Sequence, residues 1–192
     1  MIRRLYDWTL SLADSPHALR ALFIVAFIES SVFPIPPDVL IIPLVLARPD
    51  RAWVIAGTAL LGSVLGGLAG YAIGWGFFES IGQPVLEFYG KDAYFDEFRA
   101  RYNDYGAWAV LIAGVTPFPY KVITILSGST GLNLGVFMVA SIIARGIRFF
   151  VLSALLWKFG APIRSFIERY LGLLFTLFVV LLIGGFYVIK FL

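Results

Sequence analysis

Five ionisable side chains stand inside or beside long apolar stretches of this sequence: Glu29, Asp38, Lys121, Arg145 and Arg148. A charge at the centre of a membrane costs about 2.5 kcal/mol or more, so each should pair with another charge, with water or with a ligand. A carboxyl group in apolar surroundings can bind and release protons near neutrality, and an arginine can hold a phosphate through two N–H groups. These residue types therefore predict a site for an anionic group, for protons, or for both.

The five residues suit different roles. Arg145 and Arg148 are three positions apart and share one face of a helix, where they can bind an anionic headgroup or extend to the membrane surface. Glu29 follows an apolar run and is the candidate for proton coupling. Asp38 and Lys121 have opposite signs and are the best candidates for an internal ion pair that only holds the structure together.

The sequence offers little for other kinds of chemistry. It has no cysteine and a single histidine, His17, so disulfides, thiol nucleophiles and a metal site are not expected. It contains no Gly-x-Ser-x-Gly motif, and His17 is far from every Gly-Ser element. We therefore expect neither a cofactor nor an enzyme.

The composition is that of a membrane protein. Of the 192 residues, 60% are hydrophobic and only 14% are charged, and the mean hydropathy is +0.89. The apolar residues come in long runs without the alternation of strands, so the predicted fold class is an all-α integral membrane protein. The net charge of +3 is small and indicates topology signals rather than nucleic-acid binding. The expected partners are membrane lipids, anionic headgroups among them, and protons; a homodimer is a further candidate.

Segment lengths predict which parts cross the membrane. The expected segments are an interfacial amphipathic helix (1–20), a hairpin (21–47), a span (52–78), an interfacial helix (79–105), a second hairpin (107–131), a second span (134–159) and a C-terminal transmembrane helix (170–190). At about 1.5 Å per residue, neither arm of either hairpin can cross about 30 Å of hydrocarbon. Each hairpin is therefore predicted to dip into the membrane and return to the side from which it came.

Prolines break each hairpin at its tip. The first tip holds Pro34, Pro36 and Pro37, and the second holds Pro117 and Pro119. An offset of 83 residues (117 − 34) superposes the two tips and sets Asp38 on Lys121. One span separates the hairpins, so the second must enter from the opposite side. This pattern predicts two inverted repeats, each a re-entrant hairpin followed by a transmembrane helix.

Two further patterns concern packing and orientation. Four glycines at intervals of four line one face of the first span, which lets another helix approach closely: Gly62, Gly66, Gly70 and Gly74. Lysine and arginine are more frequent on the side of the membrane that holds the amino terminus, with eight against four. The eight are Arg3, Arg4, Arg20, Arg48, Arg51, Lys158, Arg164 and Arg169. The amino terminus is therefore expected in the cytoplasm.

The motif Glu29-Ser-Ser-Val-Phe-Pro-Ile-Pro-Pro-Asp38, the glycine-lined span and Pro117-Phe-Pro-Tyr-Lys121 together resemble the DedA (VTT-domain, SNARE-associated Golgi protein-like) family, and within it the small YqaA-like branch. The resemblance covers about residues 21–160. It implies two opposed re-entrant hairpins, lipid movement between leaflets, proton coupling in some members, and a bacterial cytoplasmic membrane. Glu29 and Asp38 match the family's acidic pair. Gly114 and Lys121 stand near the places of two arginines in its better-studied branch.

The favoured function is a transporter that translocates or scrambles lipids of phospholipid or polyprenyl-phosphate type. One alternative is a proton-coupled exporter of small ions or solutes, built on the same repeat. Another is a protein that organises the membrane without transport. Lipid-transport and ion-flux assays on the same vesicles separate the three.

Overall fold

The computed structural model describes residues 17–32, 36–90, 92–116, 118–160 and 162. Regular secondary structure within these residues is helical. The elements in chain order are α2 (Ala18–Ser31), α3 (Asp38–Ala47), the 3-10 turn η1 (Pro49–Arg51), α4 (Ala52–Phe77), the π-helical turn η2 (Phe78–Gly82), α5 (Gln83–Tyr89), α6 (Asp92–Val115), α7 (Tyr120–Ser129) and α8 (Leu134–Phe159). Most of the expected helix 1–20, the C-terminal helix 170–190, and the tip residues Pro34 and Pro117 lie outside the described residues.

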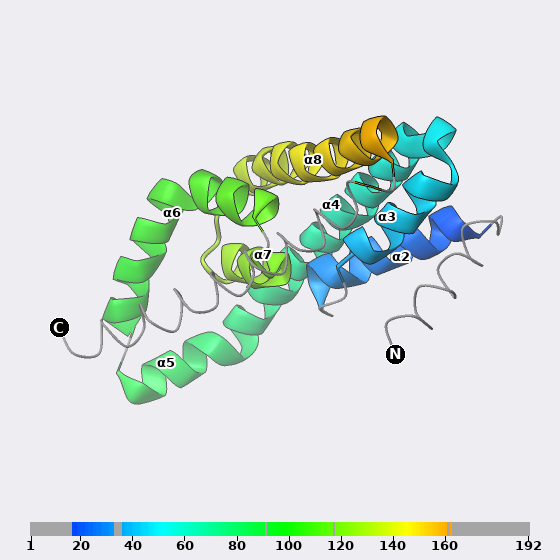
Figure 1. Cartoon of the computed structure of the whole chain (residues 1–192). Coiled ribbons are helices and arrows are strands. Elements are labelled where there is room, and N and C mark those ends of the chain that lie inside the picture. The colour runs from blue at the N-terminus through cyan, green and yellow to red at the C-terminus, as the bar shows by residue number, and fades with distance from the viewer. Residues whose placement is uncertain (1–16, 33–35, 91, 117, 161, 163–192) are drawn as a thin grey trace.

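Among the described residues, two helices are long and apolar enough to cross a membrane: the continuous helix Pro49–Tyr89, which contains α4, and α8. They lie side by side and run in opposite directions (Figure 1). The ring centroids of Trp53, near the start of α4, and Trp157, near the end of α8, are 6.0 Å apart. Those of Tyr71, later in α4, and Phe137, near the start of α8, are 5.3 Å apart. Their outer faces carry large exposed apolar side chains, such as Leu61 and Ile143. Lipid is the solvent that suits such faces.

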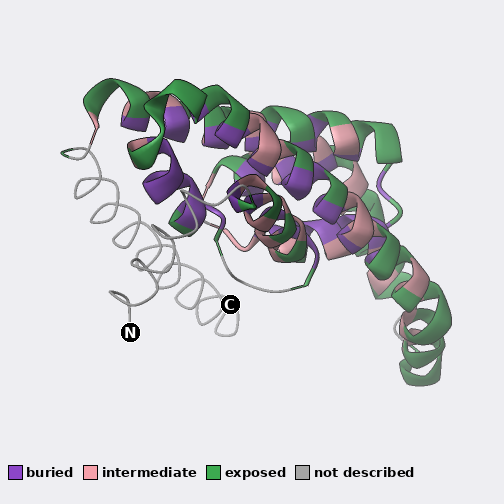
Figure 2. Ribbon diagram, turned by 90° about the vertical axis from the view of Figure 1, so that its right-hand side faces the viewer, coloured by how far each residue is buried: buried purple, intermediate pink, exposed green. Residues whose placement is uncertain are grey.

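Two further helices pack against each long helix, one after the other along its length. Helix α2 packs on the first half of α4 and α7 on the second half. In the same way α6 packs on the first half of α8 and α3 on the second half. Thus α3, from the first half of the chain, packs on the long helix of the second half, and α7, from the second half, packs on the long helix of the first. Figure 2 shows the buried residues on the faces that these helices turn toward one another.

The glycines of α4 allow this arrangement. A Cβ atom on Gly62 or Gly66 would meet the backbone of α2, at Phe23 and Phe27 respectively. A Cβ atom on Gly74 would meet the backbone of α7 at Ile125. The predicted stripe is therefore a packing surface that two different helices share.

Prolines stand directly before helices α3 and α7 and explain where these two helices begin. Pro37 precedes the first residue of α3 and has a helical φ of −64°, and Pro119 precedes the first residue of α7 with a φ of −61°. A proline at the start of a helix loses no hydrogen bond, whereas one further inside breaks the ladder. Pro43 inside α3 is the exception, and it is buried.

The structure divides residues 79–105 differently from the expected single interfacial helix. The first part continues α4 through η2 into α5, which ends at Gly90 with a φ of +60°. The second part opens α6, whose 24 residues run through Gly106 into the apolar arm of the second hairpin. Gly106 does not end the helix. It lies within α6 and packs against the side chain of Leu132. Helix α5 and the beginning of α6 extend away from the other helices as a limb (Figure 1).

The helix bounds repeat with an offset of 82 residues. Helices α3 and α7 each have 10 residues and start 82 apart (120 − 38), and α4 and α8 each have 26 residues and also start 82 apart (134 − 52). In this register Pro37 is equivalent to Pro119, and Asp38 to Tyr120. The offset of 83 taken from the proline pattern is one residue longer. One residue separates Pro36 from the start of α3, whereas α7 starts directly after Pro119.

Candidate functional site

A cluster of buried charges lies halfway along both long helices. Arg145 is the twelfth of the 26 residues of α8, and Ser63 is the twelfth of the 26 residues of α4. The Nε atom of Arg145 donates a hydrogen bond to the Ser63 hydroxyl over 2.6 Å. The two long helices therefore meet at a polar contact near half their length.

Arg145 is bound on several sides. Its Nη2 atom lies 2.6 Å from Glu29 Oε2, and Ser30 donates to the same carboxylate oxygen over 3.0 Å. The rings of Tyr120 and Phe149 each lie 4.7 Å from its Cζ atom, within the range of cation–π attraction. Only 2% of the Arg145 side chain is exposed. This arginine therefore links α2, α4 and α7 to α8.

Arg148 joins the two proline-rich tips. Its Nη2 atom lies 2.6 Å from Oδ2 of Asp38, the first residue of α3, and its Nη1 atom donates over 2.7 Å to the carbonyl oxygen of Thr116, just after α6. The exposed fractions of the Arg148 and Asp38 side chains are 15% and 8%. A carboxylate at the start of a helix also gains from the helix dipole.

Lys121 forms a second link between the tips. Its ammonium group donates over 3.2 Å to the carbonyl oxygen of Val32, the residue after α2. Next to it, the hydroxyl of Thr124 donates over 3.0 Å to the carbonyl oxygen of Ser30. The end of α2 and the beginning of α7 are therefore held together.

The charges pair differently from the expectation. Asp38 pairs with Arg148 rather than with Lys121, because the packing of α3 on α8 brings its first residue beside Arg148. Arg145 and Arg148 lie near the middle of α8, and each pairs with a buried carboxylate instead of extending to solvent. The site thus collects Glu29, Asp38, Arg145 and Arg148, two acids and two bases, with Lys121 at its edge.

Sequence reasoning missed four polar partners: Ser30, Ser63, Thr116 and Tyr120. Ser63 interrupts the glycine stripe next to Gly62, and Tyr120 lies between the last proline of the second tip and Lys121. Tyr120 is fully buried and donates its hydroxyl to Ser141 of α8. Polar residues adjacent to a proline-rich tip or within a small-residue stripe were the available signal.

Comparison with known proteins shows the family of the chain. The family model of the VTT domain matches residues 35–158, so the chain belongs to the VTT-domain (DedA) family. An uncharacterized protein of Haemophilus influenzae is 33% identical over 168 residues, which cover 85% of this chain and 87% of that protein. An uncharacterized homologue from Histophilus somni has the same identity and coverage. No solved structure matches the chain.

Membership of this family and the two long apolar helices identify the chain as a membrane protein. The family resemblance drawn from the proline-rich motifs is thereby confirmed. The match begins after Pro34 and ends one residue before the end of α8, so it includes the remaining tip prolines and almost all of both long helices. It contains Asp38, Arg145 and Arg148 and leaves out Glu29.

Proposed function

We propose that this protein moves lipids between the two leaflets of a membrane. The observation that carries the proposal is the charge-balanced cluster of Glu29, Asp38, Arg145 and Arg148, buried halfway along two antiparallel long helices. Charged side chains at membrane depth mark substrate and ion pathways. A headgroup would pass through this cluster while its acyl chains stay in the bilayer.

We also propose that the two hairpins re-enter the membrane from opposite sides. The 14 residues of α2 and the 10 of α3 or α7 correspond to about 21 Å and 15 Å, and the nine residues of α6 that follow Gly106 to about 14 Å, all short of about 30 Å of hydrocarbon. The repeated helix lengths and the exchange of short helices between the two halves support an inverted repeat. In transporters built this way the substrate site lies near the midplane, between the repeats.

The charges at the two ends support an orientation with the amino terminus in the cytoplasm of a bacterial inner membrane. The end that holds the starts of α2 and α4 carries Arg20, Arg48, Arg51 and Lys158 with Asp50. The sequence of the opposite end, residues 79–104, has three basic residues, Lys91, Arg99 and Arg101, among six acidic ones: Glu79, Glu87, Asp92, Asp96, Glu97 and Asp104. Excess lysine and arginine favours the cytoplasmic side.

Reconstitution into vesicles tests the proposal. Lipids labelled on the headgroup are incorporated, and an impermeant quencher reports how fast inner-leaflet lipids reach the outside. Wild-type protein should accelerate this exchange over protein-free vesicles, and Arg148→Gln should abolish the acceleration. Arg101→Gln is the matched control, because it removes a charge from an exposed pair with Glu97. Exchange at the protein-free rate would contradict lipid transport.

Proton coupling is the part of the proposal that the alternative exporter shares. Glu29, a carboxylate with 12% of its side chain exposed, lies at the centre of the cluster, so in either function a proton gradient would drive transport through this group. An ion-flux measurement on the same vesicles separates the two functions. Proton-coupled flux of a small ion without lipid exchange would favour the exporter.

A further inference from the structure

The two buried ion pairs are satisfied to different extents. Both Nε and Nη2 of Arg145 have hydrogen-bond partners, and aromatic rings flank its guanidinium group. In the other pair, Nε of Arg148 and Oδ1 of Asp38 are both buried and have no hydrogen-bond partner among the described residues. Only the Asp38–Arg148 pair therefore leaves buried atoms without a partner, one donor and one acceptor.

Buried polar atoms in folded proteins nearly always have a partner, so two unpaired atoms in a single ion pair point to a ligand. The Nε atom of Arg148 is a donor and requires an acceptor, whereas the Oδ1 atom of Asp38 requires a donor. A phosphate diester offers the acceptor for Arg148 but no donor for Asp38. An ammonium or hydroxyl group next to the phosphate offers that donor.

We propose that the Asp38–Arg148 pair is the part of the cluster that binds the headgroup, and that its ligand is a phosphate that carries a nearby N–H or O–H donor. This inference rests on the proposed lipid transport and names the substrate class. The phosphate accepts from Arg148, and the ammonium or hydroxyl group donates to Asp38. The Glu29–Arg145 pair is then a positioning pair, which holds α2, α4 and α7 against α8.

The location of Arg148 gives this binding a structural consequence. Its guanidinium group contacts the residue that follows the first tip, Asp38, and Thr116, which precedes the second tip. A headgroup that engages Nε and Oδ1 therefore bonds to the junction of both hairpins. Arg145 has no comparable contact with the residues that flank the second tip on its α6 side.

Two lipid pairs test the donor requirement. Phosphatidylethanolamine has N–H donors that phosphatidylcholine lacks, and phosphatidylglycerol has hydroxyl donors that phosphatidylmethanol lacks. Short-chain forms of all four are titrated against the full chain in detergent, with the thermal unfolding midpoint as the measure of binding. The same headgroups, on long chains, are compared in the vesicle exchange assay. We expect the donor-bearing member of each pair to bind at least tenfold more tightly and to exchange faster.

Variants assign the preference to this ion pair. In Asp38→Asn the amide oxygen takes the bond from Arg148, which leaves an NH2 group where Oδ1 accepted, so the preference for donor-bearing lipids should disappear. Glu29→Gln changes the other pair and should keep the preference, whatever its effect on rate. Asp50→Asn is the matched control, because it alters an exposed arginine–aspartate pair. If Asp38→Asn fails to fold, the double variant Asp38→Asn with Arg148→Gln removes both charges and should bind all four lipids equally.

The outcomes separate this inference from the proposed function. Equal binding and equal exchange within both lipid pairs would overturn the inference and leave lipid transport intact. A preference in binding without any exchange would keep the inference and refute transport. A preference that Asp38→Asn retains and Glu29→Gln abolishes would assign the headgroup to the other pair and overturn the inference.

Discussion

Arg145 and Arg148 lie one helical turn apart in α8, and both are paired with a carboxylate from the first hairpin. Transfer of an ion pair into an apolar interior is costly, so its net contribution to stability is small while both partners are present. Removing one partner is different, because it leaves a buried charge without compensation. Single substitutions in the cluster should therefore be more harmful than paired ones.

A double-mutant cycle on Asp38 and Arg148 checks this expectation. Asp38→Asn and Arg148→Gln should each lower the free energy of unfolding by about 3–5 kcal/mol, and the double variant should lose less than the sum. Denaturant titration in detergent provides the values. A parallel cycle on Asp38 and Lys121 is the control: these two are not paired, so their losses should add. Coupling between Asp38 and Lys121, without coupling between Asp38 and Arg148, would show that Asp38 pairs with Lys121 as the sequence predicted.

The proposed coupling role of Glu29 gives the second prediction at this scale. Glu29→Gln keeps an oxygen that can accept from Arg145 but leaves this buried arginine without a compensating charge, so it should lower the free energy of unfolding as the other single substitutions do. In the folded fraction, isolated by gel filtration, an imposed proton gradient should no longer change the rate of lipid exchange. Glu29 contacts Arg145 from α8 and Ser30 beside it. A rate that still responds to the gradient would exclude Glu29 as the coupling group.

The charged residues of the site could be found from sequence because charges within apolar runs are rare. Their partners could not, because pairing depends on which helix of the second half packs beside the first hairpin. Asp38 and Lys121 share a place in the proline pattern, yet α3 lies along α8, which supplies Arg148. Ser63 was missed because a single serine in a glycine-rich helix is usually a packing residue.

At the scale of elements, long apolar runs predicted the helices well. The second predicted span, 134–159, coincides with α8, and the first lies within the continuous helix 49–89. The limb was harder to predict. Two glycines, Gly90 and Gly106, are equally suited to end a helix by residue type, and only Gly90 takes the left-handed conformation that ends one.

The glycine stripe gives a prediction with a matched control in the same helix. Gly74→Ala places a methyl group against the carbonyl group of Ile125, so it should destabilise the protein by about 1–3 kcal/mol. Gly76→Ala should be neutral or stabilising by up to about 1 kcal/mol, because nothing lies within 4 Å of its new methyl group and alanine favours the helix. Unfolding midpoints of the two variants compare them directly. Equal midpoints would mean that α7 does not pack closely on α4.

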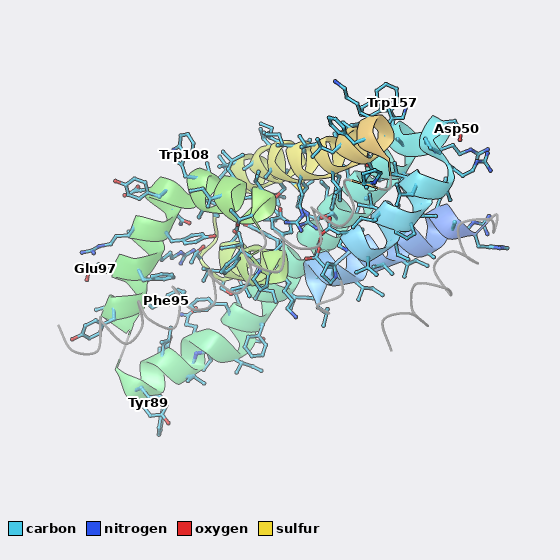
Figure 3. The ribbon with its side chains drawn as sticks, in the orientation of Figure 1. Asp50, Tyr89, Phe95, Glu97, Trp108 and Trp157 are labelled. Atoms are coloured by element: carbon cyan, nitrogen blue, oxygen red, sulfur yellow. The ribbon has the colours of Figure 1, made fainter. Side chains whose placement is uncertain are left out.

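At the scale of the molecule, the two ends differ in charge and in aromatic content. Asp50 and Trp157 mark one end, and Tyr89, Phe95 and Glu97 mark the limb at the other (Figure 3). The limb carries several exposed aromatic rings, including Phe88 and Tyr94, and none of the described residues of α5 is buried. Exposed aromatic residues among charges are typical of a membrane interface.

Single cysteines test the proposed orientation, because the chain has no cysteine of its own. Cysteine at Asp50 should react with an impermeant thiol reagent from the cytoplasmic side, and cysteine at Glu97 from the opposite side. Both side chains are well exposed, at 65% and 61%. Labelling of intact cells and of inverted vesicles distinguishes the sides. Reaction of both positions from one side would contradict a membrane crossing between them.

The contact between Ser63 and Arg145 has a consequence for how such a chain can be assembled. These positions are 82 residues apart, the same interval that relates the long helices, so each lies against its own counterpart in the other half. In a pair of identical subunits such a position faces itself. Two arginines there would repel each other, and two serines would leave Glu29 without its guanidinium partner. Because both halves belong to one polypeptide, the position of self-contact can hold two different residues, and an asymmetric charged centre becomes possible where two helices of equal length meet.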